Sequence, residues 1–424
     1  MRHWSRWAVA VAVLVSASGP AAVAVHAATT APSGPRIYWD QNEEEDWLIH
    51  PGLQQPKPLV PAWDVNGQMC IAPNGSGHFT IAYNPTTTSQ VGNPGVNKPV
   101  KLPPIGEAVW DQHGNFTGQT IAVPGPYLGG DIPGNVQSPQ DGSFNNNGTY
   151  VGCAFDPTGN LFATDIGTAQ GQAPPPDDGR LIEWFAAGNY STYCILDGPI
   201  ADGDSGTNHH VDGTGGLRQP GTIALDAQGN VLVPVVGDGP VLQGEVLKFS
   251  GLPASAASCP GSNANMPLTP VAKTLFANTT ANNQPTPQGI ARDPVCGCWA
   301  VSSVLVGNAV SWYTDAGAPD AARPSVPGNP PPPAGNTQSG YTPQGMAFAP
   351  DGTLYFADLH ITCTSGGGCG PANNEGQVMK VTFSQPGSVP STPSAVNTEP
   401  LNFPVSVTMC DPTAYPRCPA PSGR

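Results

Sequence analysis

The chain repeats, with variations, the stretch Gly152-Cys-Ala-Phe-Asp-Pro-Thr-Gly-Asn-Leu-Phe-Ala-Thr-Asp165. A second copy begins at Gly221, a third at Gly289, and a fourth runs from Gly345 to Asp358. Each copy contains a short apolar segment, a tight turn and a second apolar segment. Turn residues between two apolar runs are the sequence pattern of a β-hairpin.

A segment of alternating apolar and polar residues follows each hairpin after a loop of variable length. These segments begin at Gly179, Gly244, Asn308 and Gly376. The alternation predicts a strand with one exposed face. A unit of strands that recurs along a chain is typical of a propeller blade.

A degenerate fifth copy lies upstream, where Met69–Gly75 aligns with Met346–Gly352. The copies begin 84, 69, 68 and 56 residues apart, against roughly 40–45 residues for a WD40 blade. Loops rich in Gly, Pro and Asn account for the surplus. The apolar segments Gly34–Asp40 and Leu401–Thr408 are expected to pair, which would close the ring and remove its exposed edges.

We therefore predict an all-β fold, a six-bladed β-propeller with long Gly/Pro-rich loops. Five blades are internal to the chain and one is closed by both termini. A count of five or seven blades remains open from the spacing alone. Helix content is expected to be very low, since no segment beyond the N-terminus keeps a helical period.

The first 27 residues have the pattern of a secretory signal peptide. Arg2 and Arg6 precede an apolar core from Trp7 to Val15, and Val25-His-Ala27 is a plausible cleavage motif. The apolar run is shorter than a membrane span requires. The sequence thus predicts a secreted, extracellular protein whose residues 28–424 form one propeller domain.

The charge of the exported chain is strongly negative. Without residues 1–27, 13 Lys and Arg stand against 30 Asp and Glu, a net charge near −17. Such a surface disfavours nucleic acid and anionic lipid. We expect a small molecule or a surface polymer as the partner, and neither nucleic acid nor a membrane span. These patterns do not predict the oligomeric state.

Ten cysteines in an exported chain predict disulfides rather than metal ligands. Short spacing favours Cys363–Cys369 and Cys410–Cys418. Cys153 and Cys194 are expected to link neighbouring segments of one blade.

The remaining cysteines have less obvious partners. Cys296 and Cys298 flank a single glycine, too close for a relaxed mutual bond, so one of them is expected to pair with Cys259. A zinc site on Cys296 and Cys298 is the alternative. Cys70 has no evident local partner.

The phrases Pro287–Pro294 and Pro343–Gly352, the latter completed by Leu354–Asp358, resemble those of NHL-repeat and SMP-30/gluconolactonase-like β-propellers. The resemblance covers roughly residues 68–383. It implies a funnel-shaped ring with a ligand or metal site on the axis, where the inner strands begin. It also implies, for the lactonase branch, a metal held by a Glu in an early Gly-Glu-Gly-Pro-x-Trp motif, by Asn residues before inner strands and by an Asp.

The chain departs from the lactonase pattern at two places. Gly106-Glu107-Ala-Val-Trp110 looks like the Glu motif, but it aligns with a segment expected to form an outer strand, far from the axis. Gln288 and Gln344 stand where the lactonases have Asn. The Gln carbonyl oxygen can bind calcium, although its longer side chain changes the geometry.

The repeat places several polar residues at strand ends that are expected to converge on one mouth. Asp165 and Asp358 occupy equivalent positions, and we predict that they bind ligand together with Gln288 and Gln344. His360 follows Asp358 by two residues and is the candidate for proton transfer. A polar pair that only stabilises a turn is the alternative for Asp358 and His360.

One loop is rich in potential ligands. Asp202, Asp204 and Asn208 are candidate ligands of calcium or another divalent cation, because hard cations prefer several closely spaced oxygens. His209, next in sequence, is a second candidate for acid–base chemistry, as is His210, and Asp212 lies just beyond them. A surface turn with exposed histidines is the alternative.

These patterns favour an extracellular ligand-binding protein that acts through an axial funnel. A metal-dependent, lactonase-like hydrolase or lyase is the first alternative, and a structural or adhesive protein of the cell surface is the second. The sequence does not decide whether the protein is an enzyme. It contains no phosphate loop or dinucleotide fingerprint in the required context, so no nucleotide cofactor is expected.

Overall fold

A computed structural model describes the strands that build the fold and the turns that join many of them. The described residues are 36–39, 47–49, 57–58, 69–71, 78–82, 105–110, 116–122, 150–165, 179–198, 217–236, 243–259, 268–269, 271–305, 307–328, 340–363, 369–371, 375–385, 388–396, 400–401 and 404–410. Signal-peptide residues 1–27 lie outside them, so export stays a prediction.

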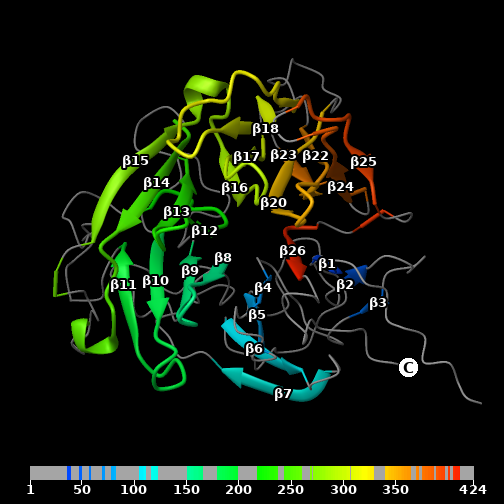
Figure 1. Ribbon diagram of the computed structural model, residues 1–424. Helices are drawn as coiled ribbons and strands as arrows, with labels where there is room; N and C mark the ends of the chain where they lie inside the picture. The colour runs from blue at the N-terminus through cyan, green and yellow to red at the C-terminus, as the bar shows by residue number, and fades with distance from the viewer. Residues whose placement is uncertain are drawn as a thin grey trace, which may run out of the picture. The chain divides into compact units, whose positions relative to one another are not determined.

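Six four-stranded antiparallel sheets and one two-stranded hairpin are present in the described part of the chain (Figure 1). The arrangement is all-β and propeller-like. Helix is limited, among the described residues, to two short 3-10 turns, Ala256–Ser258 and Thr280–Asn282.

Five of the sheets are made from consecutive strands or nearly so. The first is β4 (Met69–Ile71), β5 (His78–Ala82), β6 (Ile105–Trp110) and β7 (Phe116–Ala122); the second is β8 (Tyr150–Phe155), β9 (Leu161–Asp165), β10 (Arg180–Trp184) and β11 (Tyr193–Asp197); the third is β12 (Ala224–Leu225), β13 (Val231–Val235), β14 (Glu245–Ser250) and β15 (Ala272–Asn278). The fourth is β16 (Pro287–Arg292), β17 (Trp299–Ser303), β18 (Asn308–Tyr313) and β19 (Val326–Pro327); the fifth is β20 (Pro343–Phe348), β21 (Leu354–Asp358), β24 (Gln377–Val381) and β25 (Ser394–Ala395). The two-stranded hairpin, β22 (Ile361–Cys363) and β23 (Cys369–Pro371), is inserted between β21 and β24.

The sixth sheet joins the two ends of the chain. β26 (Val407–Cys410) pairs with β1 (Arg36–Trp39), which continues through β2 (Trp47–Ile49) to β3 (Lys57–Pro58). Tyr38 and Trp39 are fully buried in this sheet. The N-terminal strand is thus held by the C-terminal one, the pairing that the two apolar end segments predict.

The hairpin turns of the repeated phrase share one hydrogen-bond pattern. In the second sheet the Asp156 amide donates to the Asn160 carbonyl at 3.0 Å and the Gly159 amide to the Asp156 carbonyl at 3.0 Å. Asp226 and Ala349 begin the same pair of bonds in the third and fifth sheets. Gly159, Gly229 and Gly352 each have a positive φ, which explains the glycine in the turn.

A second glycine of each repeat lies where neighbouring sheets meet. A Cβ on Gly221 would collide with the Gln288 carbonyl oxygen, and one on Gly289 with that of Gln344. A Cβ on Gly152 would lie 2.6 Å from Thr222 Cα. These glycines therefore permit the backbones of adjacent inner strands to approach more closely than any other residue would allow.

Hydrogen bonds cross the same junctions. The Thr222 amide donates to the Gln288 carbonyl at 2.7 Å, and the Gly345 amide to the Val405 carbonyl at 2.8 Å. First strands contact each other in the order β4, β8, β12, β16, β20, β26, and β26 contacts β4 in turn. Each sheet is thereby attached to its neighbours through its first strand.

The observed disulfides correct the predicted pairing. Cys153 is bonded to Cys70, not to Cys194, and Cys194 is bonded to Cys259. The bonded cysteines are 83 and 65 residues apart in sequence and lie in different sheets or their loops. The prediction of a disulfide within one blade was therefore wrong.

Three further cysteine predictions have mixed outcomes. Cys296 and Cys298 are bonded to each other, contrary to expectation. Cys363 and Cys369 face each other in register in the β22–β23 hairpin, but their side chains lie outside the described atoms. Cys410 is disulfide-bonded, and its predicted partner Cys418 lies outside the described residues.

We predict that Gly289→Ala lowers the free energy of unfolding by about 2–3 kcal/mol, because the added methyl group overpacks the junction with Gln344. Gly229→Asn is the matched control. Gly229 has a positive φ of 82° and open space around it, and Asn tolerates that conformation, so the loss should stay below about 1 kcal/mol. Urea unfolding of both variants measures the difference; equal losses would contradict the role of the junction.

Candidate functional site

Three glutamines lie in or before the first strands of consecutive sheets: Gln288 in β16, Gln344 in β20, and Gln219 five residues before β12. Gln288 and Gln344 each precede the junction glycine of their own strand, and Gln219 lies two residues before Gly221. Gln288 is 5% exposed, and its Nε2 lies 3.5 Å from the Gln219 carbonyl oxygen. The junctions described above bring these strand starts to one end of the sheets.

Gln219 has an unusual backbone. Its φ is 45°, in the left-handed region that non-glycine residues rarely adopt. Such conformations persist where the surrounding structure holds them and are concentrated at functional sites. Pro220, which follows it, is buried at the junction.

Serine and threonine hydroxyls hold the strand starts in place. Ser302 Oγ donates to the Gln344 carbonyl at 2.6 Å and accepts from the Gly289 amide at 2.7 Å. In the preceding sheets, Thr164 Oγ1 donates to the Gly221 carbonyl at 2.6 Å. The amide side chains are thus carried on a backbone fixed by buried hydrogen bonds.

The carboxylate of Asp358 connects the end of β21 to Thr342, the residue before β20. Its Oδ1 accepts from the Thr342 amide at 2.8 Å and from the Thr342 hydroxyl at 3.1 Å, and burial raises its pKa although these bonds oppose the shift. In the preceding sheet, Ser303 and Thr286 make the equivalent contact at 3.0 Å. The Thr-Pro-Gln-Gly phrase therefore ties the start of a first strand to the end of the second.

His360 contacts Asp358 through its backbone amide and Glu375 through its ring. Its φ of 52° is left-handed, its backbone amide lies 3.3 Å from Asp358 Oδ1, and its Nε2 lies 3.1 Å from Glu375 Oε2. The ring is 37% exposed. The structure thus joins His360 to Asp358 through the backbone and to Glu375 through the side chain, and its catalytic role stays a prediction.

Asp165 is the most deeply buried of the predicted ligands. Its Oδ2 lies 2.6 Å from Arg180 Nη2 and 3.1 Å from Arg180 Nε, and both side chains are fully buried. The guanidinium neutralises the carboxylate in place of any cation. The ligand-binding role of Asp165 stays a prediction.

Among the described residues, the carboxylates at this end of the sheets already make other contacts. A hard cation requires several oxygens, carboxylates foremost. The described carboxylates at this end, Asp165 and Asp358, already accept from Arg180 and Thr342. What the described site offers instead is amide and hydroxyl groups.

Other predicted residues are not tested by the structure. Asp202, Asp204 and Asn208, the predicted calcium ligands, lie outside the described residues, as do His209, His210 and Asp212. Glu107 lies in β6, the third strand of its sheet in the order β4-β5-β6-β7, as its alignment with an outer strand predicts.

Sequence reasoning missed Glu183 in β10. The side chain is 1% exposed, Asn160 Nδ2 donates to its Oε1 at 3.1 Å, and Oε2 has no hydrogen-bond partner. Burial raises the pKa of Glu183 to about 8, the nearby charge of Asp156 adds to the shift, and the bond from Asn160 opposes it. A Glu within an otherwise apolar strand segment, Leu181-Ile-Glu-Trp184, was the available signal.

Comparison with known proteins adds a fold-level likeness. No family model and no curated protein matches the chain. Among solved structures, a "putative gluconolactonase" is 14% identical, with 76% of this chain and 81% of that chain covered and a TM-score of 0.42. A luciferin-regenerating enzyme is 14% identical over 77% of this chain and 83% of its own, with a TM-score of 0.40.

A third similar structure has no assigned role. It is a protein of unknown function from Bacteroides caccae, 10% identical, covering 89% of this chain and 99% of its own, with a TM-score of 0.39. The structural neighbours include proteins of the gluconolactonase-like kind that the repeated phrases resemble. No helix within the described residues is long and apolar enough to cross a membrane.

We predict that the free energy of unfolding falls as pH rises from about 5 to about 8. Glu183 binds its proton more tightly in the folded than in the unfolded chain, so its contribution is complete below the unfolded pKa and is lost as pH passes the folded pKa of about 8. The total fall should be of the order of 3–5 kcal/mol.

Glu183→Gln should remove most of this pH dependence, because the neutral amide keeps the shape of the side chain and the acceptor for Asn160. Urea unfolding at several pH values measures it. Asp351→Asn, at an exposed turn carboxylate, is the control and should leave the dependence in place. An unchanged slope in Glu183→Gln would show that another group causes it.

Proposed function

We propose that the protein is an exported ligand-binding propeller whose six sheets are the blades of one closed ring. Its site is the end of the ring where Gln288 and Gln344 lie at the starts of first strands and Gln219 precedes the first strand of the sheet before them. The observation that carries the proposal is this repetition of an amide side chain beside three neighbouring junctions. The contact of β26 with β4, which connects the terminal sheet to the first internal one, supports closure of the ring.

The chemistry of the site favours a neutral, hydroxyl-rich small molecule, such as a sugar or a sugar lactone. An amide both donates and accepts hydrogen bonds, which is what a hydroxyl requires of its partner. Asp165 is paired with Arg180, and burial raises the pKa of Asp358, which disfavours the charged form of that carboxyl. A ligand without charge therefore loses little on entering this site.

Binding of neutral sugars tests the proposal. Glucose, maltose and glucono-lactone would be titrated against the mature protein by calorimetry, with a chelator present throughout. We expect saturable binding of at least one of them. The Gln288→Ala, Gln344→Ala double variant should bind at least about tenfold more weakly, the effect of losing roughly one well-made hydrogen bond.

Gln228→Ala is the matched control, because Gln228 is exposed on a hairpin turn of the third sheet and should leave affinity unchanged. The junction bonds use the backbone carbonyls of Gln288 and Gln344, so the double variant should stay folded, with a loss of about 1 kcal/mol for the buried Gln288 amide and its contact with the Gln219 carbonyl, while Gln228→Ala should melt like the wild type. Binding that requires calcium, or lactone hydrolysis abolished by the chelator, would contradict the proposal and support the metal-dependent hydrolase. Absence of binding would favour a structural or adhesive role.

A further inference from the structure

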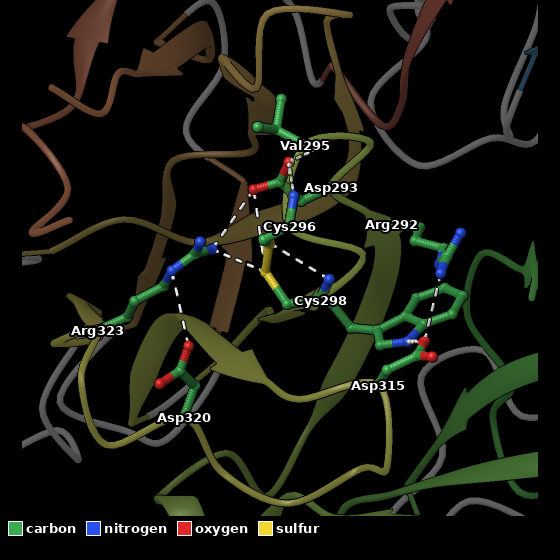
Figure 2. The surroundings of a disulfide bond; sticks show 9 residues. Arg292, Asp293, Val295, Cys296, Cys298, Asp315, Asp320 and Arg323 are labelled. Carbon is green, nitrogen blue, oxygen red and sulfur yellow. Dashed lines mark hydrogen bonds and ion pairs between the residues drawn. A yellow bond between two sulfur atoms is a disulfide. The ribbon is translucent and has the colours of Figure 1, made fainter. Parts of the chain in front are cut away.

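The hairpin of the fourth sheet carries a feature that its equivalents lack. Between Asp293 and Trp299 it is one residue longer than the turn between Asp156 and Leu161, and it contains Cys296-Gly-Cys298. Cys296 and Cys298 form a disulfide across Gly297, which has a positive φ of 67° (Figure 2).

The turn does not need this bond to close. The Asp293 amide donates to the Cys298 carbonyl at 2.8 Å and the Gly297 amide to the Asp293 carbonyl at 2.9 Å. The same two bonds close the turns at Asp156, Asp226 and Ala349 without any disulfide. A link between residues two apart also constrains the unfolded chain far less than links over 83 or 65 residues.

The two sulfurs have different surroundings. Cys296 is exposed, whereas Cys298 is 7% exposed. Arg323 Nη1 donates to Cys298 Sγ at 2.9 Å, and the Cys298 amide lies 3.3 Å from Cys296 Sγ (Figure 2). Each sulfur therefore has a hydrogen-bond donor placed to stabilise it as a thiolate.

Arg323 is held rigidly against the buried sulfur. Its side chain is 1% exposed, and its guanidinium lies over the rings of Trp312 and Phe383 at 5.7 and 5.3 Å. Asp293 Oδ2 lies 3.4 Å from Nη1 and 3.9 Å from Cys298 Sγ, and Asp320 Oδ2 lies 3.6 Å from Nε. The guanidinium is closer to Cys298 Sγ than the Asp293 carboxylate is, so its attraction for a thiolate at Cys298 exceeds the repulsion from Asp293.

A second cation lies beside the same turn. Arg292 is placed so that a Cβ on Gly297 would be 3.2 Å from its Nη2, and Asp315 Oδ1 lies 3.5 Å from that nitrogen. The turn is thus flanked by two arginines in a chain of net charge −15. Partial exposure next to positive charge is the setting of reactive rather than structural cysteines.

We propose that Cys296–Cys298 is a redox-active disulfide that exchanges with thiols of small molecules. A thiolate attacks the exposed Cys296 sulfur and forms a mixed disulfide, while the Cys296–Cys298 bond breaks and its electron pair leaves on Cys298 as a thiolate bonded to Arg323. A second thiolate attacks the substrate sulfur of the mixed disulfide. The substrate disulfide forms, Cys296 leaves as a thiolate, and two electrons have passed from two thiols to the protein.

The same residues also define the competing interpretation. The ligating atoms of Asp293, Cys296 and Cys298 lie within 4.8 Å of one another, a cluster that reduced cysteines offer to a soft metal ion. In the disulfide state neither sulfur is a thiolate, the form that binds metal. Zinc binding by the reduced protein is therefore an outcome that the experiment has to separate from exchange.

Bond-specific reduction tests the proposal. The folded full-length mature protein would be incubated with glutathione or dithiothreitol, quenched with an alkylating reagent and analysed by peptide mass spectrometry. We expect Cys296–Cys298 to be reduced at least about a hundredfold faster than Cys70–Cys153 and Cys194–Cys259, which are buried internal controls. Glutathione should be found on Cys296 and not on Cys298.

Two sets of variants test the assigned roles. Each single cysteine variant has one free thiol, so it would be incubated with oxidised glutathione. In Cys298→Ser the Cys296 thiolate should attack that disulfide, release one glutathione thiolate and accumulate the mixed disulfide, whereas Cys296→Ser should react at least about tenfold more slowly, because its remaining sulfur is buried. Arg323→Lys should slow reduction about tenfold through a poorer leaving thiolate, and Asp320→Asn, which contacts Arg323 but not the sulfur, should not. Thermal unfolding checks that each variant is folded.

Equal reduction rates for the three disulfides would overturn the proposal. So would reduction that occurs only when the protein unfolds, or glutathione attached to Cys298. Stoichiometric zinc binding by the reduced protein, without a glutathione adduct on Cys296 during reduction, would assign the cluster to a metal instead.

Discussion

The fold depends on the close approach of backbones where one first strand meets the next. At Gly221 and Gly289 the facing carbonyl oxygens of Gln288 and Gln344 occupy the space that a side chain would need. Hydrogen bonds from the Thr222 amide to the Gln288 carbonyl and from the Gly345 amide to the Val405 carbonyl cross two of the junctions. Because these contacts involve backbone atoms, they recur from sheet to sheet while the side chains around them vary.

The junctions also determine which side chains lie at one end of the sheets. Fixing the carbonyl of a glutamine leaves its side-chain amide at the strand start, and the repeat supplies two such residues, Gln288 and Gln344. Thr286 and Thr342 brace the same ends, with Ser303 and Asp358 as their partners. Asp358, a candidate ligand by its position in the repeat, thus takes part in a contact that a serine makes in the neighbouring sheet.

The sequence was sufficient for the sheets and for the pairing of the two chain ends, because glycines, turn residues and apolar alternation are local patterns. It was insufficient for the disulfides. Cys70 pairs with Cys153 because β4 and β8 are neighbours, which depends on the order of sheets and not on spacing. Two further features depend on burial, which no local sequence pattern reports. These are the raised pKa of Glu183 and the fully buried Arg180–Asp165 ion pair. Arg323 reaches Cys298 from 25 residues away, so the sequence pointed to the two cysteines without the cation that distinguishes them.

Native-state hydrogen exchange of the junction amides tests the central claim most directly. If the junctions join the sheets into one cooperative structure, the Thr222 and Gly345 amides should exchange only by global unfolding, with the same protection free energy as amides in the central strand β13. Exchange of Thr222 and Gly345 at much lower free energy, while β13 stays protected, would show that the sheets open independently and would contradict the account.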